Sequence, residues 1–171
     1  MNSKDFSFDI DLHIGMRMIK TVIAVFISIF ITNLIGGIPL NAAIAAIICL
    51  QATQEATVKK GKERVVGTFI GGFFSAIFLF LIDTFDVQLF TNLYYLIMSL
   101  LIIPVIKTAV TLKAPDSASS ASIVMLITLL SYVKTEEKYL FVLLRVLDTL
   151  VGVFTSIIIN LLLPKNKNHK K

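Results

Sequence analysis

The sequence has few charged residues, one cysteine and two histidines. Charged residues make up 16% of the 171 positions, against roughly 25% in an ordinary soluble domain. Hydrophobic residues make up 56%, and the mean hydropathy is +0.86. The single cysteine, Cys49, excludes an internal disulfide and leaves no cysteine pair for a metal. This composition is typical of an integral membrane protein.

Sequence motifs of enzymes and of ATP-driven pumps are missing as well. The chain has no GxSxG, HExxH or P-loop segment, and His13 and His169 lie near its two ends. We therefore expect no catalytic site, no metal and no cofactor. The basic segment KKGKER, residues 59–64, has no interleaved aromatic residues, which argues against a nucleic-acid partner.

Long apolar runs predict an all-α integral membrane protein with six transmembrane helices. A run of about 18 or more apolar residues can cross a hydrocarbon core of about 30 Å. The six predicted spans are residues 18–35, 39–53, 65–82, 93–112, 117–133 and 139–163. The second span is short and the fifth begins with the polar segment SASSAS, so these two are the candidates for a tilted, broken or re-entrant segment.

The distribution of basic residues predicts that both ends of the chain lie on the inner side of the membrane. In that topology thirteen of the sixteen basic residues are on the inner side, and the outer loop DTFDVQLFTN has none. Residues 1–16 then form an inner segment, 17–164 the six-helix domain and 165–171 a basic inner tail, which we expect to contact anionic lipid headgroups. The first apolar run has no small-residue cleavage site and is expected to be retained.

Two segments resemble each other at an offset of 81 residues. They are RVVGTFIGGFFSAI, residues 64–77, and RVLDTLVGVFTSII, residues 145–158. Spans three apart cross the membrane in opposite directions, so the match indicates a possible 3+3 inverted repeat, a feature of secondary transporters. Close helix packing alone would explain the same match.

Steps of four residues place small and polar side chains on one face of the first, third and sixth spans. The sets are Lys20, Ala24, Ser28 and Thr32; Gly67, Gly71, Ser75 and Leu79; and Asp148, Gly152, Ser156 and Asn160. Small residues let transmembrane helices approach closely, so Gly67, Gly71 and Gly152 are helix-packing candidates.

The ionisable residues within the spans are the candidates for function. Arg145 and Asp148 are three residues apart on one helix face. A carboxylate in the membrane needs a partner, so the two form either a structural ion pair or a proton-coupling Asp148 beside an anion-binding Arg145. Arg17 and Lys20 satisfy the positive-inside rule without a ligand. Lys20 nevertheless lies on the small-residue face, where it can meet an anionic substrate.

Uncharged polar residues extend this set of candidates. Asn160, Asn41, Thr68 and Thr149 can line a cavity, or each can bond a neighbouring backbone carbonyl. Gln51, placed within the second span, is expected to bond across the bundle. The substrate-binding candidates are therefore Arg17, Lys20, Arg145 and Asn160, and Asp148 is the proton-coupling candidate.

Three segments resemble the membrane domain of the aromatic acid exporter family, within the wider fusaric acid resistance protein superfamily. They are GMRMIKTVIAVFISIFI, QATQEATVKKGKERVVGTFIGG and RVLDTLVGVFTSIIINLLLP, and the resemblance covers residues 15–164. It implies six-span units that export aromatic carboxylic acids across the bacterial plasma membrane. Many members continue into a cytoplasmic helical domain, whereas this chain ends seven residues after Pro164.

The sequence thus predicts a plasma-membrane exporter of small organic anions, coupled to protons and assembled as a homo-oligomer, with a dimer as the simplest form. The alternative is a membrane scaffold that binds a partner and transports nothing. Unchanged phenotypes of Asp148→Asn and Lys20→Ala variants would favour the scaffold.

Overall fold

The computed structural model describes residues 15–85, 88–132 and 137–163, and these residues form helices and no strands. The inner tail predicted at 165–171 and most of the segment predicted at 1–16 lie outside them. The elements are α1 (Met16–Leu34), α2 (Pro39–Cys49), α3 (Gln54–Phe85), α4 (Asn92–Leu100), α5 (Ile102–Thr111), η1 (Pro115–Ser117), α6 (Ala118–Leu130) and α7 (Lys138–Leu162).

Each of the six predicted spans contains helix, and the all-α fold is confirmed. Within the described ranges, four helical segments are long and apolar enough to cross a membrane: Met16–Leu34, Gln54–Phe85, Asn92–Thr111 and Tyr139–Leu162. The other two, Pro39–Cys49 and Pro115–Leu130, are shorter apolar helices. They are the two spans that the sequence marks as irregular, and six complete crossings stay a prediction.

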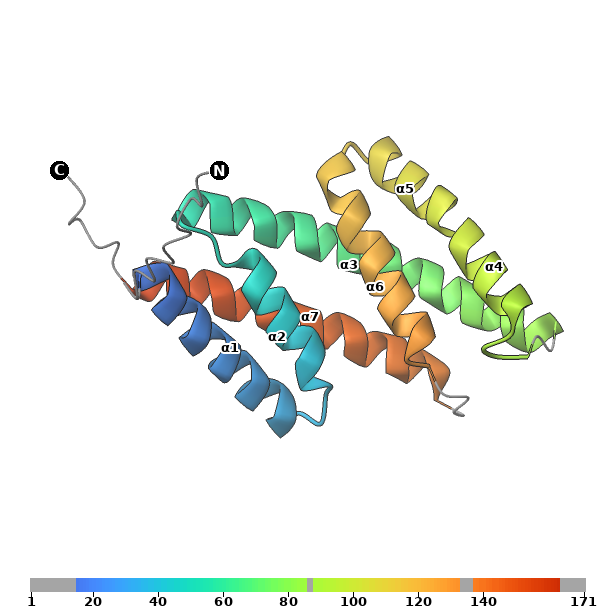
Figure 1. Ribbon diagram of the computed structural model, residues 1–171, viewed down its shortest axis with the longest axis horizontal. Coiled ribbons are helices and arrows are strands. Elements are labelled where there is room, and N and C mark those ends of the chain that lie inside the picture. The colour runs from blue at the N-terminus through green and yellow to red at the C-terminus, as the bar shows by residue number, and fades with distance from the viewer. Residues whose placement is uncertain (1–14, 86–87, 133–136, 164–171) are drawn as a thin grey trace, which may run out of the picture.

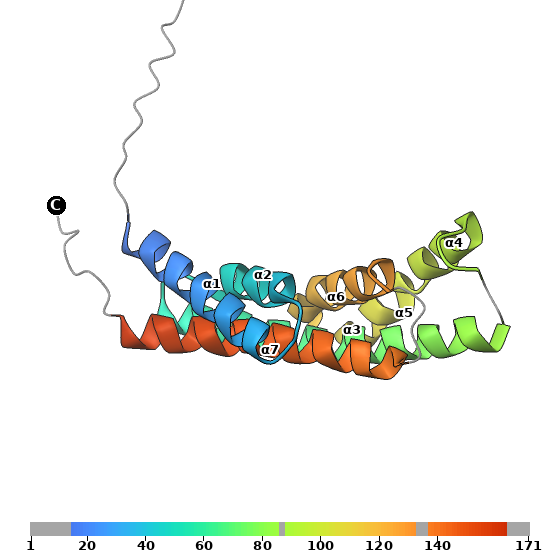
Figure 2. The same ribbon diagram turned by 90° about the horizontal axis from the view of Figure 1, so that it is seen from below.

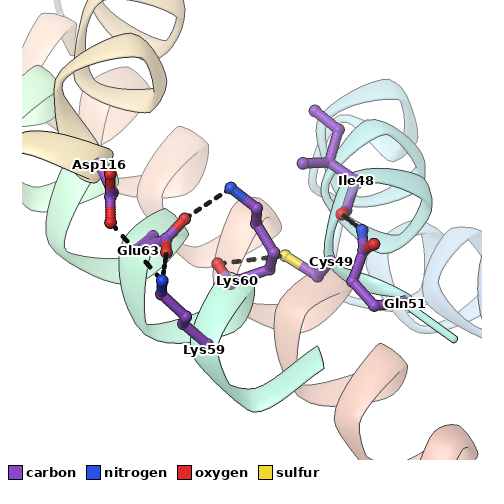
Figure 3. Close-up of polar contacts among 7 residues, drawn as sticks. All are labelled: Ile48, Cys49, Gln51, Lys59, Lys60, Glu63 and Asp116. Atoms are coloured by element: carbon purple, nitrogen blue, oxygen red, sulfur yellow. Dashed lines mark hydrogen bonds and ion pairs between the residues drawn. The ribbon is translucent and has the colours of Figure 1, made fainter. Parts of the chain in front are cut away.

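Helix α3 begins at Gln54, well before the apolar run that starts at Val65. The preceding residues are mostly good helix formers, so the helix continues beyond the apolar part. Glu63 supports this first part, because it accepts a hydrogen bond from Lys60 Nζ at 2.7 Å and lies 3.9 Å from Lys59 Nζ (Figure 3). Hydropathy alone detects the membrane part of such a helix and misses its polar extension.

The predicted span 93–112 is divided into α4 and α5 around Leu101. Pro104 explains the division: it has no N–H to donate to the carbonyl of Leu100, and its ring clashes with that carbonyl. The chain nevertheless keeps a helical backbone at Leu101, with φ −65° and ψ −17°. The division is thus a local break within one continuous run.

The helices form two layers. The long helices α3 and α7 lie side by side and run in opposite directions, and α1, α2, α6 and α4 lie on one side of this pair (Figures 1 and 2). Helix α2 packs on α7, and α6 packs on α3. In Figure 1 one end of each helical segment lies toward the upper left: the start of α1, α3 and α6, and the end of α2, α5 and α7. Successive helical segments therefore alternate in direction.

The predicted small-residue faces are the buried faces. Lys20, Ala24, Ser28 and Thr32 are the buried residues of α1, and the corresponding four-residue sets of α3 and α7 are buried too. The opposite face of α1 is apolar and exposed, with Phe26 exposed by 68%. Such a face suits contact with lipid chains rather than water.

Glycines bring the layers into backbone contact at matching places. A Cβ on Gly71 would lie 2.5 Å from the carbonyl oxygen of Ala121 in α6. A Cβ on Gly152 would lie against the carbonyl oxygen of Ala42 in α2 and 2.8 Å from the Cβ of Ala45. Gly67 is equally close to α6, where a Cβ would lie 2.6 Å from the Cβ of Ser120. At all three positions any side chain would separate the helices.

Candidate functional site

The side chain of Asp148, a residue of α7, lies against the start of α2. Its Oδ2 accepts hydrogen bonds from the backbone N–H of Ile38 at 2.8 Å and from Nδ2 of Asn41 at 3.2 Å. Pro39, the first residue of α2, has no N–H of its own. The positive end of the helix dipole also favours a carboxylate at this point. Asp148 therefore caps α2 from the neighbouring helix α7.

Asp148 is closely surrounded by other residues, and its second carboxylate oxygen, Oδ1, makes no hydrogen bond with a described residue. The residue is fully buried, and its Oδ1 has no hydrogen-bond partner among the described residues. Gly37 allows this arrangement, because a Cβ there would lie 3.0 Å from Cγ of Asp148. One carboxylate oxygen is thus engaged by the cap, and the other makes no hydrogen bond with a described residue.

Arg145 and Asp148 do not form a direct ion pair. Asn41 lies between them: its Oδ1 accepts a hydrogen bond from a terminal nitrogen of Arg145, and its Nδ2 donates to Asp148. The Arg145 guanidinium also lies 5.1 Å from the ring centre of Phe141. The sequence predicts Arg145 as the partner of Asp148. In the structure the side-chain amide of Asn41, from α2, lies between the two and bonds to both.

Asn160 lies at the other end of α2. Its Nδ2 donates to Oγ1 of Thr57 at 2.6 Å and lies within reach of the backbone carbonyls of Gln51 at 3.3 Å and Thr53 at 3.2 Å. The backbone N–H of Gln51 donates to Oγ1 of Thr57 at 2.9 Å. Asn160 thereby fixes the connection between α2 and α3.

Asp148 and Asn160 together bracket the short helix α2. At about 1.5 Å per residue, the 11 residues of α2 extend about 16 Å, and the twelve-residue step from Asp148 to Asn160 extends about 18 Å along α7. Backbone groups at both ends of α2 would lack partners in hydrocarbon. Asp148 binds the N–H of Ile38 just before α2, and Asn160 approaches the carbonyls of Gln51 and Thr53 just after it, so both residues have a structural role whatever else they do.

Lys20 is a buried cation bonded to neutral groups. It is 6% exposed, and its Nζ donates to Oδ1 of Asn160 at 2.8 Å and lies 3.5 Å from the carbonyl oxygen of the same residue. It makes no ion pair with a carboxylate of the described segments. A pocket of about 360 Å³ lies beside it, lined by Lys20, Ala52, Thr53, Gln54, Glu55 and Asn160. This pocket can offer a positive charge to an anion.

A second buried cation, Arg64, lies deeper between the layers. It is 3% exposed, and its Nε has no partner in the described part of the chain. A cavity of about 10 Å³ lies between α2, α3, α6 and α7, lined by Asn41, Ile44, Arg64, Val124, Ile127, Thr128, Arg145 and Thr149. Arg64 and Arg145, which match at the offset of 81, therefore meet at one cavity.

The two arginines sit in similar local structures. Thr68 Oγ1 donates to the carbonyl of Arg64 at 2.7 Å, and Thr149 Oγ1 donates to the carbonyl of Arg145 at 3.0 Å. Thr68 and Thr149 thus bond the backbone of their own helices, one of the two possibilities that the sequence leaves open.

Two other candidates lie away from this centre. Arg17 is exposed on the first turn of α1, and its side chain makes no hydrogen bond or ion pair with another described residue. Gln51 follows the end of α2, and its Nε2 donates to the carbonyl of Ile48 at 2.8 Å (Figure 3). The prediction that the Gln51 side chain bonds across the bundle is wrong, because the helix ends before it.

Arg64 lies at this cavity although the sequence does not single it out as a substrate-binding candidate. It is the last residue of the basic segment 59–64, so the positive-inside rule accounts for its charge without any ligand. Its match with Arg145 was the available signal. Only the packing of α3 against α6 brings it to the same cavity.

The chain matches a known protein family over most of its length. The profile described as "Aromatic acid exporter family member 1" matches residues 12–163. The chain belongs to this family. Together with its apolar helices, membership of the aromatic acid exporter family identifies a multi-pass membrane protein of bacteria and supports a transport function. The family is one of exporters rather than enzymes.

Curated relatives of this aromatic acid exporter family protein are UPF0421 proteins of staphylococci. One from Staphylococcus haemolyticus is 26% identical over 159 residues, which cover 92% of this chain and 45% of the relative. One from Staphylococcus aureus strain NCTC 8325 is 28% identical over 148 residues, covering 86% and 42%. One from Staphylococcus saprophyticus is 37% identical over 68 residues, covering 40% and 21%.

The chain spans less than half the length of these relatives. No solved structure matches it.

Proposed function

We propose that this chain is the membrane part of an exporter of small organic anions, first of all aromatic carboxylates, in the bacterial plasma membrane. The observation that carries the proposal is Lys20. It is a buried cation with neutral partners, beside a pocket of about 360 Å³. A carboxylate that entered this pocket would form a charge-assisted hydrogen bond with Nζ, stronger than the present bond to the Asn160 amide.

In this proposal the six helical segments cross the membrane with both ends of the chain inside, as a 3+3 inverted repeat. The alternating directions of the segments support the topology (Figure 1). The packing of α2 on α7 and of α6 on α3, each at a glycine, supports the repeat. Gly67 and Asp148 occupy matching positions of the two repeats, and their difference has a structural reason. Asp148 bonds the start of α2, whereas Gly67 lets α6 approach α3 closely.

The residues act in two places. Lys20 and Asn160 receive the anion at the inner pocket, with Arg17 at the exposed start of α1 attracting it. Arg145 holds the anion deeper in the bundle, and Asp148 carries the proton that couples export to the gradient. The unpartnered Oδ1 of Asp148 supports this role, because this oxygen is not engaged by any donor of the described residues.

The proposed assembly is a homodimer surrounded by lipid. Figure 2 shows that one side of the α3 and α7 layer is not covered by the other described helices. Phe73 of α3 and Phe154 of α7 are exposed by 63% and 57%. A second copy and lipid chains are both suited to such an apolar surface.

The first prediction concerns Asp148→Asn. The Asn oxygen can still accept the hydrogen bond from Ile38, so we expect the cap and the fold to survive while the titratable group is lost. Purified protein in proteoliposomes should move a labelled aromatic acid in response to a pH gradient. Asp148→Asn should abolish the response to the gradient, and Lys20→Gln should weaken uptake at low substrate concentration.

Asp116→Asn is the matched control, because Asp116 is an exposed carboxylate in an ion pair with Lys59 at 3.8 Å. It should transport like the wild type. If a known transporter reconstituted in parallel works and no acid of the panel is moved by the wild type, the export proposal fails and a membrane scaffold becomes the better interpretation. If Asp148→Asn keeps full gradient dependence, proton coupling at Asp148 is refuted.

A further inference from the structure

Two arginines meet at the small cavity between α2, α3, α6 and α7, and their charge is not balanced there. Arg64 and Arg145 are 3% and 5% exposed, and Nε of each has no partner among the described residues. Arg145 has Asn41 and the ring of Phe141 as neighbours. The guanidinium of Arg64 makes no hydrogen bond or ion pair with any residue of the described ranges.

The nearby acidic residues do not compensate Arg64. Glu63, adjacent in sequence, is bonded to Lys60 at 2.7 Å, and Asp116 lies 3.8 Å from Lys59 (Figure 3). Asp148 is engaged with the start of α2 and reaches Arg145 through an amide.

Two guanidiniums line the cavity and no carboxylate of the described residues does, so its lining carries a net positive charge. Arginine stays protonated in proteins, so this charge cannot be relieved by losing a proton. A buried charge is unfavourable unless an opposite charge or a full set of hydrogen bonds compensates it.

We propose that the cavity between Arg64 and Arg145 is a binding site for one monovalent anion. Its volume of about 10 Å³ is roughly that of one water-sized group. The group that fits is a halide ion, or a single oxygen of a carboxylate whose remaining atoms extend out of the cavity. Planar guanidiniums donate to such a group from two sides, one from α3 and one from α7.

The site deepens the proposed function only in its carboxylate form, in which it would hold the head group of the exported acid. In its halide form it is independent of transport. The hydroxyl groups of Thr128 and Thr149, which line the cavity, donate to the carbonyls of Val124 and Arg145. Their oxygens therefore do not add donors, and the two arginines provide the binding.

Anion-dependent thermal stability tests the site. The full chain is purified in detergent with methanesulfonate as reference anion, because sulfonate oxygens are weaker hydrogen-bond acceptors than carboxylate oxygens. Unfolding is followed with a thiol-reactive dye, since the single cysteine, Cys49, is fully buried in the folded protein. Sodium chloride and sodium benzoate are titrated in separate arms at constant ionic strength. A hundredfold excess over Kd should raise Tm by about 5–10 °C, and the rise should saturate.

Arg64→Gln and Arg145→Gln should abolish this rise, whereas Lys107→Gln, which removes an exposed positive charge, should keep it. A rise with chloride alone identifies a halide site, and a rise with benzoate identifies the carboxylate form. No rise in either arm overturns the proposal. A rise that persists in Arg64→Gln also overturns it, because the anion then binds elsewhere.

Without a binding anion, Arg64→Gln should have a Tm equal to or above that of the wild type, because it removes an uncompensated buried charge. A lower Tm would mean that Arg64 has a structural partner and would contradict the proposal. Should Arg64→Gln fail to fold, Arg64→Lys keeps the charge and should bind the anion more weakly; failure of both would refute the proposal. An anion-dependent Tm without transport leaves the site standing and refutes the export function alone.

Discussion

The contact between α2 and α7 at Gly152 gives a prediction with a clear magnitude. A Cβ at Gly152 would lie against the backbone carbonyl of Ala42 and 2.8 Å from Cβ of Ala45, whereas carbon atoms pack best at about 3.5–4.0 Å. Gly152→Ala must therefore push α2 away by about 1 Å. Overpacking of this kind costs about 1–3 kcal/mol.

Gly61→Ala in α3 is the matched control. Its Cβ would meet the end of the Ile157 side chain at 3.0 Å and Cγ1 of Val153 at 3.1 Å, and side-chain ends can move more easily than backbone. Both substitutions gain about 0.5–1 kcal/mol of helix propensity, so their difference isolates the steric cost.

Thermal unfolding in detergent, read out with the thiol dye, measures this difference. At roughly 3 °C per kcal/mol for a chain of this size, Gly152→Ala should melt about 3–9 °C below Gly61→Ala. Equal melting temperatures of the two variants would refute the argument that backbone contact between α2 and α7 sets this stability.

Two further substitutions test single hydrogen bonds in the same assay. Tyr94→Phe removes the bond from the buried Tyr94 hydroxyl to the carbonyl of Leu129 at 2.7 Å and should cost about 1 kcal/mol; no change would mean that the bond has no net value. Asn41→Leu removes the amide between Arg145 and Asp148 and should cost about 3 kcal/mol or more, because two hydrogen bonds to charged groups are lost. A cost below about 1 kcal/mol would show that these two bonds have little net value.

The buried faces of the long helices could be predicted from the sequence. A four-residue step from Lys20 to Thr32 follows the geometry of any α-helix, and small residues mark the side where helices meet. Pro104 could also have indicated the division of the fourth span, although the hydropathy of residues 93–112 gives no sign of a break.

The polar centre could be predicted only in part. Asp148 and Asn160 stand out in the sequence because polar residues within an apolar run are costly. Their partners, Ile38 and Thr57, are more than 100 residues away in the chain, and no local rule selects them. The role of Asn41 between two charges likewise depends on how α2 docks on α7.

The shortness of α2 has an electrical consequence. A helix of about 16 Å covers roughly half of a 30 Å hydrocarbon core, and the pocket beside Lys20 lies where α2 connects to α3, at its inner end in the proposed topology. The membrane voltage falls mainly across the part of a protein that excludes water, and in the proposed topology water in this pocket would shorten that part to about the length of α2. A cell interior that is negative by 100 mV favours the outward passage of a monovalent anion by about 2.3 kcal/mol. In the proposed export function, an anion leaving the cell would then gain most of that energy within about three turns of helix.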